Sequence, residues 1–280
     1  MDYLTLNNGQ KCPVTGIGTY LLAPSDAENS VREALKMGCR LIDTANVYVN
    51  ERAVGRGMKD SGVKREDIFL STKLWPTEYE NPDAVNETLA RLGVEYVDLL
   101  YIHQPAGNWL AGYRQLEKAY KEGKTKAIGI SNFEGEFIAE LEKNWEIVPQ
   151  FIQVEAHPYF TQKELRVTLD KYGIKLMSWY PLGHGDKSLI NEPVFAELGR
   201  KYGKTSAQII LRWHTQMGFA VIPGSKKVNH IKDNLNILDF KLTEEEMAEI
   251  AKLDKGERYY HRTDAQLAGF ASWKPTFERA

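Results

Sequence analysis

Four side chains that can exchange protons stand at or just after the ends of short apolar segments: Asp43, Tyr48, Lys73 and His103. The steps from Asp43 to Lys73 and from Lys73 to His103 are both 30 residues (73 − 43 and 103 − 73). This is about the length of one strand–helix–strand unit. In a parallel barrel, successive strands end at one mouth, where active sites are built. The spacing therefore predicts that a carboxylate, a phenol, an ammonium and an imidazole converge in one small volume.

These four groups suit proton transfer coupled to hydride transfer. A phenol has a pKa near ~10 in water, so it gives up its proton reluctantly at neutral pH. A neighbouring ammonium lowers that pKa, and a carboxylate keeps the ammonium charged. We therefore expect Asp43 and Lys73 to tune Tyr48 as a general acid, with His103 orienting a substrate oxygen. Because no side chain donates hydride, a nicotinamide cofactor is implied.

Each of these residues also has a structural interpretation. Asp43 and Lys73 could form an ion pair inside a barrel, Tyr48 could be a tyrosine of the rim, and His103 could be a capped surface histidine. Taken singly, each structural interpretation is the commoner one. The agreement between spacing and strand-end position favours catalysis for the four residues together.

The elements that must position these residues are short apolar segments alternating with amphipathic stretches. The predicted strands are 16–19, 40–43, 69–73, 98–102, 127–131, 151–154, 175–179 and 220–223. Capping-box patterns at Thr161, Thr205 and Thr243 predict helix starts. Residues 1–15 read as a β-hairpin around an Asn-Gly turn. We therefore predict one α/β domain over 1–280, a single (β/α)8 TIM barrel whose N-terminal β-hairpin caps the bottom.

A doubly wound sheet is the competing fold. It would need a Gly-x-Gly-x-x-Gly turn after its first strand. Here Gly16-Ile17-Gly18 is followed by Leu21 where that pattern needs a third glycine.

Composition indicates an ordinary globular protein. Hydrophobic residues make up 42% of the 280 residues, charged residues make up 26%, and the net charge is −2. No basic run exceeds the pair Lys226–Lys227, so we expect neither a nucleic-acid nor a membrane partner. Cys12 and Cys39 are too few for a disulfide scaffold, and the first residues lack the pattern of a signal peptide. We expect a cytoplasmic protein.

Five motifs between Gly16 and about Leu242 resemble those of one enzyme family. They are Gly38-x-Arg40-x-Ile42-Asp43-Thr44-Ala45-x-x-Tyr48-x-Asn50-Glu51, Ser71-Thr72-Lys73-Leu74-Trp75, Ile102-His103-x-Pro105, Gly129-Ile130-Ser131-Asn132-Phe133 and Gln153-Val154-Glu155-x-His157-Pro158. Together they resemble the aldo-keto reductases, in particular the bacterial diketogluconate reductase-like members. The resemblance implies NAD(P)H-dependent reduction of aldehydes or ketones to alcohols, reversibly, with Tyr48 as proton donor. The alternative on the same barrel is a non-catalytic nicotinamide-nucleotide-binding sensor or regulatory subunit.

The resemblance also carries cofactor contacts to particular positions. They are Gly18, Thr19, Asp43, Ser131, Asn132, Gln153, Trp179, Leu182, Ser225, His230, Asp233 and Asn234. NADP(H) is the family's usual cofactor. However, Gly224 and His230 stand where the family commonly has a lysine and an arginine for the 2′-phosphate, which leaves NAD(H) or dual use open. Lys226 or Lys227 could compensate, or both could be solvated surface lysines.

Substrate contacts are expected from aromatic side chains around the mouth. The resemblance implies Tyr20, Tyr48, Trp75, His103 and Trp109, and we expect the tail 257–280 to lie over the active-site mouth. The partner is then a small carbonyl compound, and the protein is expected to be a monomer. His157, His184 and His214 match no zinc-binding spacing, so no metal is expected.

Overall fold

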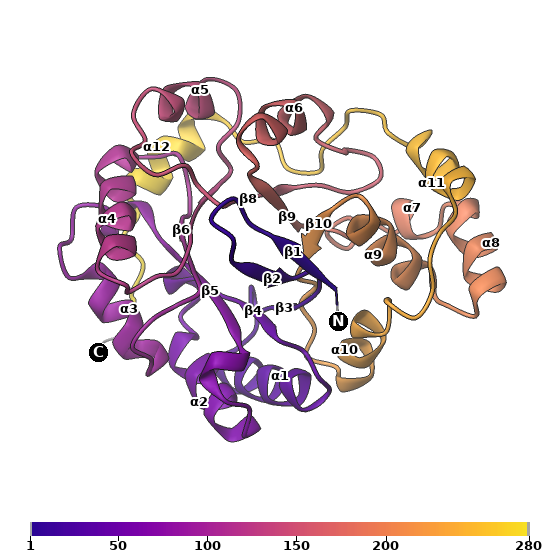
Figure 1. The fold of residues 1–280 in the computed structure, drawn as a ribbon, viewed down its shortest axis with the longest axis horizontal. Coiled ribbons are helices and arrows are strands. Elements are labelled where there is room, and N and C mark those ends of the chain that lie inside the picture. The colour runs from indigo at the N-terminus through magenta and orange to yellow at the C-terminus, as the bar shows by residue number, and fades with distance from the viewer. Residues whose placement is uncertain (1, 279–280) are drawn as a thin grey trace.

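Eight parallel strands form the centre of the structure, a computed structural model that describes residues 2–278 (Figure 1). They are β3 (Ile17–Gly18), β4 (Leu41–Asp43), β5 (Phe69–Leu74), β6 (Leu99–Ile102), β7 (Ile128–Ser131), β8 (Phe151–Glu155), β9 (Lys175–Trp179) and β10 (Phe219–Val221). Adjacent strands in the chain are adjacent in the sheet. A parallel bridge between Thr15 and Val221 joins the two ends of the sheet. The predicted barrel is confirmed, and every predicted strand overlaps an observed one.

Helices follow the strands and surround the barrel (Figure 1). They are α1 (Pro24–Lys36), α2 (Glu51–Ser61), α3 (Ala84–Leu92), α4 (Trp109–Lys121), α5 (Glu136–Glu142), α6 (Lys163–Tyr172), α7 (Lys187–Ile190), α8 (Pro193–Tyr202), α9 (Ser206–Gln216), α10 (Val228–Leu235), α11 (Glu244–Ala251) and α12 (Asp264–Ser272), with short 3-10 turns η1 (Asn46–Tyr48), η2 (Arg65–Asp67) and η3 (Pro76–Glu78). Within residues 2–278, no helix combines the length and apolar character needed to cross a bilayer.

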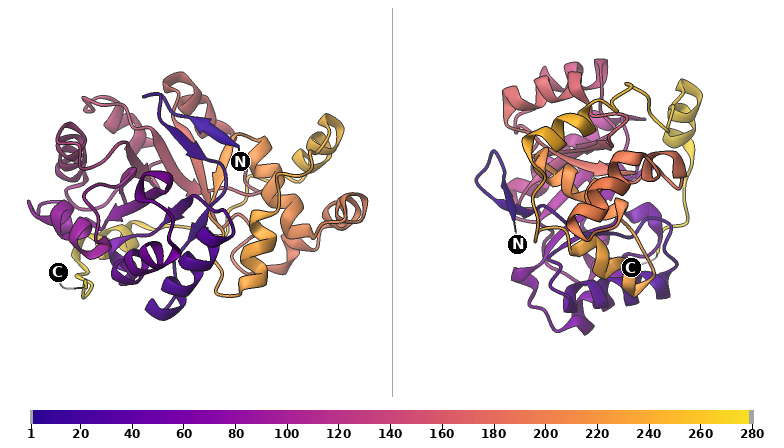
Figure 2. Two further views of the ribbon diagram at one scale, coloured as in Figure 1. Left: turned by 60° about the horizontal axis from the view of Figure 1, so that its bottom comes forward. Right: turned by 90° about the vertical axis from the view of Figure 1, so that its right-hand side faces the viewer.

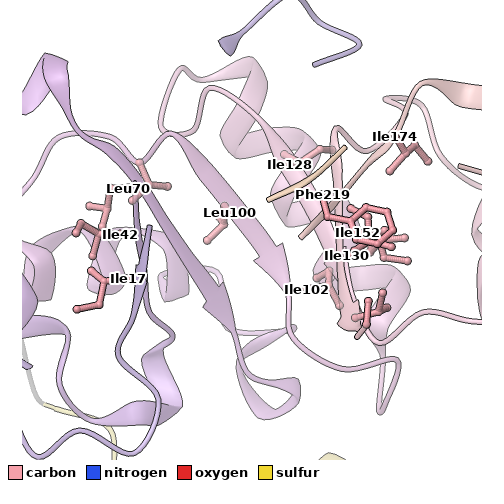
Figure 3. Packing of buried hydrophobic residues seen from close by; sticks show 14 of the residues in the cluster. Ile17, Ile42, Leu70, Leu100, Ile102, Ile128, Ile130, Ile152, Ile174 and Phe219 are labelled. Carbon is pink, nitrogen blue, oxygen red and sulfur yellow. The ribbon is translucent and has the colours of Figure 1, made fainter. Parts of the chain in front are cut away.

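Strand side chains alternate between two cores, as the pleat of a strand requires. Ile42, Leu70 and Leu100 belong to the outer core between the strands and the helices (Figure 3). Their neighbours Leu41 and Phe69 fill the inside of the barrel, in a separate apolar cluster. Two residues further along the same inward face, the strands carry polar groups instead of apolar ones. The period of two therefore brings a polar layer above the apolar interior.

The N-terminal hairpin closes one end of the barrel, as predicted. Strands β1 (Tyr3–Thr5) and β2 (Lys11–Pro13) pair antiparallel, and Figure 1 shows them across the middle of the ring of strands. Leu6 and Cys12 are buried in the same cluster as the side chains inside the barrel. The side chain of Asn8 donates to Lys126 O at 3.0 Å, which ties the hairpin turn to the barrel.

Two of the three predicted capping boxes are confirmed. Thr205 and Thr243 each accept a hydrogen bond at the start of a helix, α9 and α11 respectively. The prediction at Thr161 is wrong, because α6 begins at Lys163 and the Thr161 hydroxyl donates to Asp254 instead, at 2.5 Å. A distant carboxylate thus takes the hydroxyl that the local pattern assigned to the helix.

The C-terminal segment lies on the side of the barrel opposite the hairpin (Figure 2, right). Trp273 packs its ring against Trp75 at a centroid distance of 5.4 Å, and Phe270 does so at 5.3 Å. The indole nitrogen of Trp75 also donates to Trp273 O at 3.3 Å. Aromatic contacts of this kind hold α12 and the residues after it against the loop that follows β5.

The contact between α2 and α3 should not tolerate a larger residue at Gly55. A Cβ atom there would lie 2.3 Å from the backbone oxygen of Leu92, so one helix would have to move. We expect Gly55→Ala to lower the free energy of unfolding by about 2 kcal/mol or more.

The matched control is Gly269→Ala in α12, where a Cβ atom would meet no atom within 4 Å. Because alanine favours helix over glycine, that variant should be as stable as the wild type or more stable by up to about 1 kcal/mol. Urea denaturation of the three proteins measures both effects. Equal stability of Gly55→Ala and the wild type would contradict the close contact.

Candidate active site

A cavity of about 920 Å³ lies at the carboxyl ends of the barrel strands. The predicted site residues that line it are Gly18, Tyr20, Asp43, Tyr48, Trp75, His103, Ser131, Asn132, Gln153, Trp179, Leu182, Ser225 and His230. They come from loops and strands spread over more than 200 residues of the chain. The barrel brings them together because all of its parallel strands end on the same side.

The structure places the other predicted residues outside this lining. Lys73 is fully buried beneath the cavity floor. Thr19 is also buried, and its hydroxyl donates to Thr44 Oγ1 at 2.8 Å. Trp109 packs against Phe133 at a ring distance of 5.3 Å, and its substrate contact stays a prediction. Asp233 and Asn234 lie on α10, one turn beyond His230.

The floor of the cavity contains a buried ion pair. Lys73 Nζ donates to Asp43 Oδ2 at 2.5 Å and to Thr44 O at 2.8 Å. The other carboxylate oxygen, Asp43 Oδ1, accepts from Ser71 Oγ at 2.7 Å and from Gln153 Nε2 at 3.0 Å. Burial lowers the pKa of the Lys73 ammonium, and Asp43 acts in the opposite direction. These bonds tie β4, β5 and β8 to one another directly below the cavity.

Tyr48 stands above this pair at the end of η1. Its ring centroid is 5.2 Å from Lys73 Nζ and 5.7 Å from the His103 ring. Desolvation raises the pKa of the Tyr48 hydroxyl well above its ordinary value, and the charges of Asp43, Tyr20 and Tyr180 act in the same direction. The net direction is therefore the opposite of the lowering predicted from Lys73, because desolvation is the largest cause. Asp43 offsets the ammonium at short range, so Tyr48 keeps its proton at neutral pH.

His103 follows β6 and is 8% exposed. Its pKa is lowered well below the ordinary value, mainly by burial and further by the positive charge of Lys73. The ring packs edge-on against Trp75 at 5.2 Å. Among residues 2–278, its Nδ1 atom finds no hydrogen-bond partner. The site thus presents a neutral imidazole beside a protonated phenol.

A second polar group lies at the ends of β7, β8 and β9. Asn132 adopts a left-handed backbone with φ of 64°. Its side chain donates to His103 O at 3.2 Å and accepts from the Trp179 indole at 3.1 Å. Ser131 and Gln153 are buried beside it at the ends of β7 and β8. Together these residues offer donors and acceptors next to an indole ring, a set that suits a flat carboxamide-bearing ring.

The cavity extends to the start of α10, where its lining becomes basic. Ser225, Lys226, Lys227 and His230 line this end, and Lys226 Nζ lies 3.8 Å from Asp26 Oδ2. Gly18 also lines the cavity. A Cβ atom there would lie 2.7 Å from Ile222 O, so a residue larger than glycine would not fit without a shift. A long cavity with amide and hydroxyl groups at one end and cations at the other fits an extended dinucleotide.

The sequence comparisons decide the family. A family model described as the aldo/keto reductase family matches residues 15–255. The chain belongs to the aldo-keto reductase family. It is 43% identical over 271 residues to the glyoxal reductase of Bacillus subtilis (strain 168), covering 95% of this chain and 98% of the relative. It is 35% identical over 259 residues to the methylglyoxal reductase DkgA of Escherichia coli (strain K12), covering 91% and 94%.

A solved aldo-keto reductase agrees in fold. The crystal structure of a Bombyx mori aldo-keto reductase in complex with NADP superimposes with a TM-score of 0.87 at 31% identity, covering 95% of this chain and 96% of that one. Aldo-keto reductases bind a nicotinamide cofactor and reduce carbonyl groups with it. The present chain is such an oxidoreductase, and the relatives give no support to the non-catalytic alternative.

Several residues of the reductase's cavity were missed by sequence reasoning. Tyr180 and His184 stack at a ring distance of 3.6 Å, and both have left-handed backbones. Tyr260, from the C-terminal segment, lines the cavity and meets the Trp179 ring at 5.9 Å. Arg262 donates to Asn132 O at 2.8 Å. The aromatic character of the tail was visible in the sequence, but a partner 130 residues away leaves no local signal.

No metal centre emerges from the remaining histidines of the reductase. Within residues 2–278, no group of three or more His, Cys, Asp or Glu side chains is placed to hold a metal ion. The His214 ring nitrogens instead lie 2.8 Å from Ile210 O and 3.0 Å from Ala156 O, so whichever nitrogen carries the proton donates to a backbone oxygen. His157 lies 3.0 Å from Glu155 Oε1.

The lowered pKa of His103 predicts a loss of stability in mild acid. Below pH ~6.5 the unfolded chain protonates this histidine and the folded chain does not, so the free energy of unfolding falls as pH decreases. Between pH 8 and pH 5 the contribution of this one residue has an upper limit of about 2 kcal/mol, reached when the folded chain keeps it neutral throughout. In His103→Asn, the loss of stability over this range should be smaller by up to that amount. Urea denaturation at both pH values tests this, and equal losses in the two proteins would refute it.

Proposed function

We propose that this reductase transfers hydride from NADPH to small aldehydes, with Tyr48 as the proton donor. The observation that carries the proposal is the pairing of a protonated phenol and a neutral imidazole, with ring centroids 5.7 Å apart, above a buried ammonium–carboxylate pair. A carbonyl oxygen placed between Tyr48 and His103 would meet two hydrogen-bond donors. Its carbon would then face the amide-lined side of the cavity.

The cofactor supplies the hydride when it is bound. On the protein's side, Ser131, Asn132 and Gln153 would hold the carboxamide, and the indole of Trp179 would pack on the ring. Polar side chains in fixed positions suit this role because an amide needs both donors and acceptors. The Asn132 amide accepts from the Trp179 indole and the Gln153 amide donates to Asp43, so neighbouring side chains already hold both amides in place.

The raised pKa of Tyr48 keeps the proton available for transfer. As the proton leaves, negative charge grows on the phenolic oxygen, and the ammonium of Lys73 stabilises that charge through its field. Asp43 keeps Lys73 charged in spite of its burial. His103 is neutral and donates a hydrogen bond that fixes the carbonyl oxygen without competing as an acid.

NADP(H) is our preferred cofactor. Ser225, at the basic end of the cavity, uses its hydroxyl to cap the turn before α10, accepting from Lys227 N at 3.1 Å. Lys226, Lys227 and His230 line the cavity around that turn. Asp233 and Asn234 follow on α10, where we expect them to contact the adenine. Two lysines near a 2′-phosphate would offset the glycine at 224. The weak ion pair of Lys226 with Asp26 leaves its ammonium free to turn towards the ligand.

The substrate half of the cavity is aromatic. Tyr20, Trp75, Phe270 and Trp273 line it together with Gln104. The relatives named for glyoxal and methylglyoxal reduction point to short aldehydes carrying a second carbonyl group. We propose these as substrates, with aromatic aldehydes as a second accepted group because the walls are flat and apolar.

Replacing Tyr48 by phenylalanine should remove the proton donor and spare cofactor binding. We expect kcat for methylglyoxal to fall by about a thousandfold or more, with the Kd of NADPH changed by less than about threefold. The control is Tyr113→Phe on α4, which removes a hydroxyl that donates to Ile147 O. NADPH oxidation and fluorescence titration measure the two quantities. Near-normal turnover of Tyr48→Phe would rule out this residue as the acid.

Cofactor preference can be tested at His230, which is exposed on α10. In the wild type we expect NADPH to bind more tightly than NADH. His230→Arg adds a permanent charge and bidentate donors, so the Kd of NADPH should fall by about tenfold while that of NADH stays nearly constant. Gly224→Lys is a poorer test, because a Cβ atom there would lie 3.0 Å from Gly18 O. Equal effects on both nucleotides would place phosphate recognition elsewhere.

A further inference from the structure

The C-terminal segment is attached to the barrel by a buried carboxylate. Glu155, at the end of β8, is 1% exposed. Its Oε1 atom accepts from Tyr259 N at 2.5 Å, and its Oε2 atom accepts from Tyr260 N at 3.2 Å. His157 Nε2 lies 3.0 Å from the same Oε1. Both oxygens are thus committed to the start of the tail, which fixes where the following residues lie.

Arg262 follows two residues later and reaches the cofactor side of the cavity. One of its terminal nitrogens donates to Asn132 O at 2.8 Å. The guanidinium also lies 5.5 Å from the centre of the Phe137 ring. Arg262 is half-buried, and burial lowers its pKa. The ordinary pKa of an arginine is so high that the guanidinium stays charged. It therefore provides a charged donor to one particular backbone carbonyl.

That carbonyl belongs to a residue with an uncommon backbone that connects three strand ends. Asn132 has φ of 64°, a left-handed conformation that few non-glycine residues adopt and that asparagine tolerates better than most. Its side chain bonds the backbone of His103 after β6 and the indole of Trp179 at the end of β9. A change in the backbone of Asn132 would move both of these contacts. A charge-assisted bond to its carbonyl opposes that change.

We propose that Arg262 is a positioning residue for the nicotinamide half of the cofactor site. By holding the backbone of Asn132, it sets the direction of the Asn132 amide and the tilt of Trp179. The tail then acts on cofactor binding as well as covering the substrate. This inference rests on the proposed role of Asn132 and Trp179 at the nicotinamide.

The competing explanation is that Arg262 only anchors the tail. Arg258 is a matched control for that role, because it lies in the same segment and pairs with Glu134 at 2.5 Å. It also lies over the Phe160 ring at 4.5 Å, and its hydrogen bond goes to Glu134 and not to Asn132. If tail anchoring alone matters, removing either arginine should raise the KM for the aldehyde alike and leave nucleotide binding unchanged.

The test compares Arg262→Gln, Arg262→Lys and Arg258→Gln by fluorescence titration with two ligands. NADPH contains the nicotinamide, and 2′,5′-ADP contains only the adenosine half. For Arg262→Gln we expect the Kd of NADPH to rise about tenfold and the Kd of 2′,5′-ADP to change less than about twofold. Arg262→Lys should recover most of the NADPH affinity, and Arg258→Gln should bind both ligands like the wild type.

An unchanged NADPH affinity in Arg262→Gln, or an equal loss for both ligands, would overturn the proposal. So would the same NADPH loss in Arg258→Gln. If Arg262→Gln does not fold, Arg262→Met keeps the contact with Phe137 without a donor and should show the same selective loss. A wild-type protein that binds no NADPH would contradict the proposed function instead, so the two failures are distinguishable.

Discussion

The buried pair of Lys73 and Asp43 is the interaction on which the rest of the site depends. Two charges placed in a protein interior are costly unless they neutralise one another and every remaining donor and acceptor finds a partner. Here the ammonium also bonds Thr44 O, and the carboxylate also bonds Ser71 and Gln153. These partners belong to β4, β5, β8 and the loop after β4. The pair therefore holds three strands of the barrel in register just below the cavity.

The same pair determines which protonation states the cavity presents. The negative charge of Asp43 helps to keep Tyr48 protonated, and the positive charge of Lys73 helps to keep His103 neutral. The result is one proton donor and one neutral hydrogen-bonding partner side by side at neutral pH. Free tyrosine and histidine side chains in water would not be held in this combination over so wide a pH range. A buried ion pair thus sets the protonation states of both reacting groups.

Much of this arrangement could be predicted from the sequence. The eight strands were recognisable because buried strands are short and continuously apolar, and the convergence of Asp43, Lys73 and His103 followed from their spacing. The strand period of two then explains why they point inwards. Each lies an even number of residues beyond an interior side chain such as Leu41, Phe69 or Leu99.

Other features depended on contacts between distant segments. Thr161 carried a sound capping pattern, but Asp254 took its hydroxyl. Trp109 packs against Phe133, a contact 24 residues along the chain that the sequence does not indicate. The pKa of Tyr48 was assigned the wrong direction, since a sequence names the charges near a group without their distances or the loss of water around it.

The sequence by itself determined the barrel, its hairpin and the identity of the reacting groups, because these follow from periodicity and from residue type at strand ends. Only the tertiary structure decided which groups touch. Two such contacts join segments that are distant in the chain. Glu155 attaches the tail by accepting from Tyr259 N, and Arg262 donates to Asn132 O across 130 residues. Local propensity cannot encode them, because hydrogen bonding and desolvation depend on distances of a few ångströms that are set only when the whole chain has packed.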